Sequence, residues 1–157
     1  MADKIEKEIE QLLAEGRKKP QIWKQLRKGE KPYKALFFLN NAAKPEDRRK
    51  YQILNLFLAL ILGFITFKKL LTALSFGSLD IFLLLGLVVP IINIYVLREI
   101  LRFHRLGYRF LFVLSCLSLL QPENHHLQEI IFILLMIAAS GYLHLQMFPG
   151  KEQISID

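Results

Sequence analysis

The chain has 157 residues, of which 53% are hydrophobic, and a formal net charge of +7. This length suits one domain. Its single cysteine, Cys116, excludes an intrachain disulfide and any metal site that needs several cysteines from one chain. The hydrophobic residues are concentrated after position 50, so we expect an all-α, polytopic membrane protein rather than a soluble globule.

Residues 1–44 are predicted to form a basic, cytoplasmic segment of short helices. Apolar residues recur at helical spacing between Ile5 and Leu13, and Gly16 is expected to end this first helix. Pro20 and Pro32 stand where first-turn prolines belong, so two further short helices are expected there. Helices this short are unstable alone in water. They are therefore expected to pack as a compact cap over the membrane helices, to lie among lipid headgroups, or to bind a partner.

Residues 45–150 are predicted to form a four-helix transmembrane bundle, followed by a flexible tail at 151–157. Four apolar runs give expected spans at about 51–67, 79–97, 106–121 and 127–148. We expect the helix that begins at Pro45 to continue into the first span. The third span is short, since its apolar centre would rise only roughly 17 Å, and a re-entrant hairpin is the alternative.

The distribution of basic residues predicts the topology. With four spans, both termini and the loop at 98–109 lie on one side of the membrane, together with 19 of the 21 Lys and Arg residues. Lys68 and Lys69 lie on the other side. The positive-inside rule therefore places both termini in the cytoplasm, and we expect an integral protein of a bacterial inner membrane.

Several residues of the second and fourth spans are candidates for helix packing. Pro90 is expected to kink the second span, and Asn93 is expected to face another helix. Gly86 and Pro90 make one narrow face, and Ala138 to Gly141 make a patch of small residues on the fourth span. We expect these faces to pack the two spans together within one chain. A homo-oligomer contact is the alternative.

Basic and aromatic residues near the cytoplasmic ends of the spans form the candidate contact surface. The basic members, which we call the collar, are Arg48, Arg49, Lys50, Arg98, Arg102, Arg105 and Arg109. The aromatic members are Trp23, Tyr33 and Phe37. Each basic residue near an anionic membrane contributes about 1 kcal/mol of attraction, so anionic lipids are the expected partner. Another membrane or cytoplasmic protein is the alternative, and no nucleic acid is expected because the adjacent spans explain the charge better.

His104 and His144 are the candidate cofactor ligands. Both are expected near the cytoplasmic end of the bundle, so a bis-histidine haem or a quinone pocket is conceivable. Ordinary interfacial polar contacts are the alternative that we favour, and we expect no cofactor. His125 and His126 are adjacent, which does not place two ligands on one helical face, so no metal is expected.

The sequence favours a non-enzymatic protein. It contains no P-loop, His-Glu-x-x-His or Gly-x-Ser-x-Gly motif. Its charged residues lie near the expected span ends, whereas proton-coupled exporters need an ionisable group in mid-membrane. We therefore expect an accessory, assembly or interaction subunit that acts through its cytoplasmic basic face. An oligomeric small transporter or channel is the alternative, and a membrane enzyme that binds lipid headgroups or haem is a third hypothesis.

Overall fold

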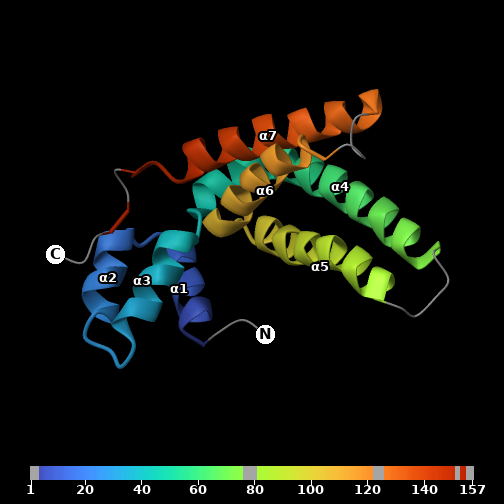
Figure 1. Cartoon of the computed structure of the whole chain (residues 1–157). Coiled ribbons are helices and arrows are strands. Elements are labelled where there is room, and N and C mark those ends of the chain that lie inside the picture. Colours follow the sequence, from blue (N-terminus) through green and yellow to red (C-terminus); the bar gives the residue numbers. More distant parts are fainter. Residues whose placement is uncertain (1–3, 76–80, 122–125, 151–152, 155–157) are drawn as a thin grey trace.

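The computed structural model describes residues 4–75, 81–121, 126–150 and 153–154, and within these it contains seven α-helices and no strands. The helices are α1 (Lys4–Ala14), α2 (Lys19–Leu26), α3 (Pro32–Asn41), α4 (Pro45–Ser75), α5 (Ile81–Leu101), α6 (Arg105–Ser118) and α7 (Leu127–Met147). Figure 1 shows α1 to α3 gathered at one end of the four longer helices.

The three short helices form a unit, which we call the cap. Their apolar faces share a core in which Ile9, Ile22 and Leu39 are buried. Gly16 ends α1 with a backbone φ of +80°, a conformation that glycine adopts without steric cost. The three helices therefore stabilise one another through this shared core, as helices too short to be stable alone in water must.

The four longer helices, α4 to α7, form what we call the helical body. Helix α4 packs against α5 and α7, and α6 packs against the same two helices. The core between them includes the buried side chains of Leu58, Leu62, Tyr108 and Leu143. The cap lies at the end where α4 and α6 begin and where α5 and α7 end (Figure 1). Ile154 lies at the same end, because its backbone is hydrogen-bonded to Asn40 of α3.

Three helical segments of the described chain are long and apolar enough to cross a membrane. They are Pro45–Ser75, Leu83–Leu101 and Leu127–Met147. Large apolar side chains on them face outward, and Ile53 is 86% exposed, which is consistent with an integral membrane protein. Helix α6 is not among the three, because its 14 residues rise only roughly 21 Å against a hydrocarbon core of about 30 Å.

The connection between α5 and α6 differs from the sequence prediction. Because glycine often marks a turn, the sequence predicts that the chain bends near Gly107. In the structure α5 ends at Leu101 and the chain turns at residues 102–104. Gly107 lies within the first turns of α6, where a Cβ atom would stand 2.8 Å from the backbone nitrogen of Ile100. The glycine is needed because α5 and α6 approach closely, and not because the chain bends at this position.

The small residues predicted to pack α5 on α7 contact other helices. A Cβ atom on Gly86 would lie 3.2 Å from the Cβ of Ala73 in α4, and one on Gly141 would lie 3.2 Å from the ring of Phe112 in α6. Both glycines therefore serve close packing within the chain, but with different partners from those expected.

Three further packing candidates have different surroundings. Pro90 lies inside α5 and is buried, and the helix continues through it to Leu101. Asn93 is half-buried and Ala138 is exposed. Ser78 and Asn124, whose residue types and positions predict N-caps for the second and fourth spans, lie outside the described residues.

Candidate functional site at the junction of cap and body

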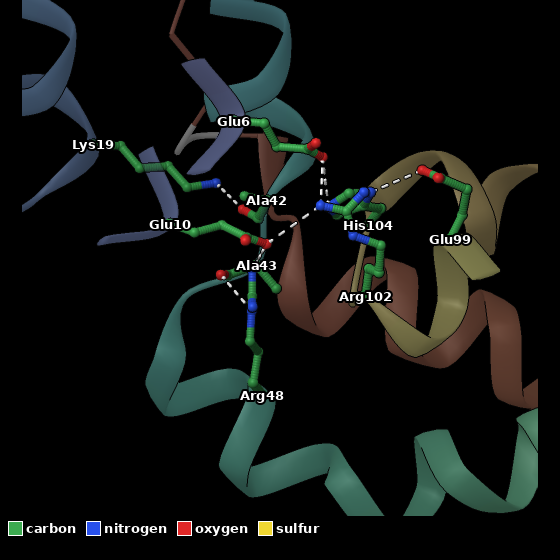
Figure 2. Close-up of polar contacts among 9 residues, drawn as sticks. All are labelled: Glu6, Glu10, Lys19, Ala42, Ala43, Arg48, Glu99, Arg102 and His104. Atoms are coloured by element: carbon green, nitrogen blue, oxygen red, sulfur yellow. Dashed lines mark hydrogen bonds and ion pairs between the residues drawn. The ribbon is translucent and has the colours of Figure 1, made fainter. Parts of the chain in front are cut away.

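A cluster of acidic and basic side chains joins the cap to the helical body. Oε1 of Glu6 in α1 lies 2.9 Å from Nη2 of Arg102 and 3.5 Å from Nε2 of His104. The other ring nitrogen of His104, Nδ1, lies 2.8 Å from Oε2 of Glu99. Glu6, Glu99 and His104 are all buried, and Figure 2 shows His104 between the two carboxylates. Burial strengthens such charge pairs because water no longer screens them.

A second acid from α1 extends this cluster to the start of α4. Oε1 of Glu10 lies 3.6 Å from Nη2 of Arg48 and 3.9 Å from Nη2 of Arg102 (Figure 2). Glu6 and Glu10 are four residues apart and therefore lie on one face of α1. We call the whole cluster the latch, and its members are Glu6, Glu10, Arg48, Glu99, Arg102 and His104.

The backbone between cap and body is also held by side chains. Nζ of Lys19 donates a 2.7 Å hydrogen bond to the carbonyl of Ala42, and Nε of Arg48 donates a 3.2 Å bond to the carbonyl of Ala43. The amide of Ala43 donates to the carbonyl of Phe103 at 3.3 Å. Phe103 has a φ of +55°, which is rare for a residue with a side chain. The left-handed turn thus brings the α5–α6 connection against the chain that enters α4.

A shallow open groove of about 330 Å³ lies beside the latch, between α3 and α6. It is lined by Tyr33, Leu36, Phe37, Asn40, Asn41, Arg105, Leu106 and Arg109. Oδ1 of Asn41 accepts a 2.9 Å hydrogen bond from the amide of Leu106. Because this amide belongs to the first turn of α6, Asn41 caps α6 from the neighbouring helix and fixes the two walls of the groove together.

The groove combines cationic and aromatic side chains. Arg105 and Arg109 form no ion pair with any described residue, and Nε of Arg105 is buried without an acceptor there. Tyr33 is 73% exposed and Phe37 is 50% exposed. The groove therefore presents two arginines that have no acidic partner among the described residues, beside accessible aromatic rings.

The predicted contact residues separate into three groups. Tyr33, Phe37, Arg105 and Arg109 come together in the groove, whereas Arg48 and Arg102 belong to the latch. Arg49, Lys50 and Arg98 are exposed on the surface. Trp23 is half-buried against the core of the cap. Sequence position alone did not separate the basic residues that pair with carboxylates in the latch from those that form no ion pair in the described part of the chain.

The two candidate cofactor ligands have unlike surroundings. Both ring nitrogens of His104 face carboxylates. His144 stacks its ring on Phe148, and its Nδ1 is buried without a hydrogen-bond partner among the described residues. In the part of the chain that the structure describes, no group of three or more His, Cys, Asp or Glu side chains is arranged to hold a metal ion.

The acidic half of the latch was not among the predicted site residues. The available signal was the spacing of Glu6 and Glu10, which lie four residues apart next to the apolar positions of α1. Glu99 stands five residues before His104, and nothing in its local sequence distinguishes it from the other charges near the expected span ends. No family model, curated protein or solved structure matches this chain.

Proposed function

We propose that the protein is a non-enzymatic integral membrane protein that acts as an accessory or interaction subunit through the basic face at its cap end. In this proposal α4 to α7 all cross a bacterial inner membrane and the cap lies in the cytoplasm. The excess of basic residues at the cap end supports this orientation. Helix α6 is short, but it packs between α5 and α7, and Arg109 is long enough to extend toward the headgroups.

The groove between α3 and α6 is the observation on which the proposal depends. Exposed aromatic rings beside unpaired arginines are typical of contact surfaces, where Tyr, Phe and Arg are enriched. The groove also lies where the apolar helical body meets the basic cap. The latch and Asn41 hold α3 against α6, so the surface is formed before a partner arrives and binding costs little ordering entropy.

The proposal is tested by extracting the protein from its native membrane under mild conditions and measuring its assembly by native mass spectrometry. We expect the wild type to retain a partner protein, bound lipid or both. The double variant Tyr33→Glu/Phe37→Glu should lose them, because it places negative charge in the groove. The matched control Lys24→Glu/Lys28→Glu changes two exposed residues of the cap outside the groove and should retain them. A bare monomer in the wild type, or equal losses in both variants, would contradict the proposal.

A further inference from the structure

We infer that the groove binds the phosphate of an anionic phospholipid, with Arg105 and Arg109 holding the phosphate and the outer face of α6 lying along an acyl chain. This inference rests on the proposed placement of the cap end at the cytoplasmic surface of the membrane. It names the ligand class of the groove, which the proposed function leaves open.

Among the described residues, no carboxylate balances the positive charges of Arg105 and Arg109 in the groove. Arg105 and Arg109 are one helical turn apart on α6, roughly 6 Å along the axis, and like charges at this spacing repel. Arg48 and Arg102, by contrast, face the carboxylates of the latch. An anion between Arg105 and Arg109 would convert their repulsion into attraction, and the planar guanidinium group binds phosphate through paired hydrogen bonds.

An exposed apolar surface continues along α6 from Arg109. Val113 and Leu117 follow it at intervals of four residues, and both are more than half exposed. They therefore lie on the same face of α6 as the arginine and extend roughly 12 Å beyond it. A free phosphate or an acidic peptide would leave this face uncovered. A phospholipid would cover both the charged end and the apolar stripe with one molecule.

Two aromatic rings lie in the groove across from the arginines. Tyr33 and Phe37 stand one turn apart on α3, on the opposite wall of the groove from the arginines, and both are exposed. Aromatic side chains, above all Tyr and Trp, are enriched at the level of lipid headgroups, where apolar and polar surroundings meet. The groove therefore offers cationic and aromatic side chains to the lipid headgroup, and the outer face of α6 offers apolar side chains to the acyl chain.

The test uses the full chain in nanodiscs that contain equal amounts of phosphatidylglycerol and phosphatidylcholine, with retained lipids counted by native mass spectrometry. We expect the wild type to retain phosphatidylglycerol selectively. Arg105→Gln/Arg109→Gln should weaken this retention about tenfold or more, since two phosphate contacts are lost. Arg27→Gln/Lys28→Gln removes two exposed charges of the cap outside the groove and should leave the selectivity unchanged.

Two further variants separate the ligand sources and guard against misfolding. Arg109→Lys keeps the charge but removes the planar guanidinium, so we expect partial retention of phosphatidylglycerol. Val113→Ser/Leu117→Ser keeps both arginines and should weaken retention of the lipid. If inorganic phosphate displaces the lipid equally from this variant and from the wild type, the site binds a free anion and the inference is wrong.

Two other results would overturn lipid binding in the groove, and the second of them would leave the proposed function standing. Equal loss of phosphatidylglycerol from the groove variant and the cap control would show only diffuse surface attraction, and would overturn the inference. Retention of an acidic protein in the groove without selective lipid would also overturn it, while the proposed interaction subunit would stand.

Discussion

The hydroxyl of Tyr108 in α6 donates a 2.6 Å hydrogen bond to Oδ1 of Asn55 in α4, and Nδ2 of Asn55 donates a 3.0 Å bond to the carbonyl of Ile100 in α5. Both side chains are buried. The side-chain amide of Asn55 therefore links α4, α5 and α6. Its partner Ile100 is the neighbour in sequence of Glu99 in the latch. In an apolar interior, a buried polar group without a partner costs free energy, so both groups depend on each other.

The pairing of these two residues predicts a non-additive effect on stability. Tyr108→Phe removes the donor and leaves Oδ1 of Asn55 without it, so we expect a loss of about 1 kcal/mol in the free energy of unfolding. Asn55→Leu should cost at least as much, because it leaves the tyrosine hydroxyl without its acceptor. The double variant should be less destabilised than the sum of the two. Unfolding in detergent micelles measures all three, and strict additivity would show that the residues are not coupled.

The latch predicts that the cap can be loosened without disturbing the helical body. Glu6→Gln removes the buried carboxylate that faces Arg102 and His104, while Glu10 remains 3.9 Å from Arg102. We expect a loss of about 1–3 kcal/mol in the stability of the cap on the body. Hydrogen exchange should therefore quicken in α1, with α4 and α7 unchanged.

The control for this experiment is Glu15→Gln. Glu15 pairs with Arg17 at 3.2 Å, but both side chains are about half exposed, so its loss should have an effect close to zero. Equal changes in the two variants, or faster exchange throughout the chain, would show that the latch does not hold the cap specifically.

Much of the fold could be predicted from local chemistry. Pro32 and Pro45 each begin a helix where first-turn prolines belong, and Gly16 ends one. The length of the apolar runs also identified three of the segments that can span a membrane. These features depend on residues that are close in sequence, so local patterns are enough to predict them.

The contacts of the latch and the groove could not be predicted from local sequence patterns. Glu6 meets Arg102 and His104 only because the turn at Phe103 and the packing of the cap bring distant segments together. A pattern of charges shows which residues carry charge, but not which of them are paired. The prediction that Tyr33 and Arg109 belong to one surface rested on their expected membrane depth, and no local pattern indicated that α3 would lie against α6.

The adjacent asparagines at the end of α3 predict two separable effects. Oδ1 of Asn41 caps α6 through the amide of Leu106, so Asn41→Ala should lower stability by about 1 kcal/mol. Asn40 instead exchanges two hydrogen bonds of 3.0 Å with the backbone of Ile154, in the tail that was expected to be flexible. Asn40→Ala should therefore expose the tail to carboxypeptidase and leave the unfolding midpoint nearly unchanged. If Asn41→Ala freed the tail equally, the two side chains would not have distinct roles.

Two helical glycines provide a matched test of the close approach between α5 and α6. A Cβ atom on Gly107 would stand 2.8 Å from the nitrogen of Ile100 and 2.9 Å from the backbone carbon of Glu99, whereas one on Gly63 would meet nothing within 4 Å. Gly63→Ala should be neutral or stabilising by up to about 1 kcal/mol, since alanine favours the helix. Gly107→Ala should destabilise by roughly 1–3 kcal/mol or more, because the neighbouring atoms are backbone and cannot rotate away.

The same substitution should also affect the latch. Glu99 and His104 flank the turn that Gly107 packs against, so moving the backbone there should separate the carboxylate from the ring and loosen the cap. Hydrogen exchange in α1 should then quicken in Gly107→Ala and not in Gly63→Ala. If Gly107→Ala unfolded like the wild type with an unchanged cap, the α5–α6 turn would be able to open freely. The geometry of His104 would then not depend on this close contact.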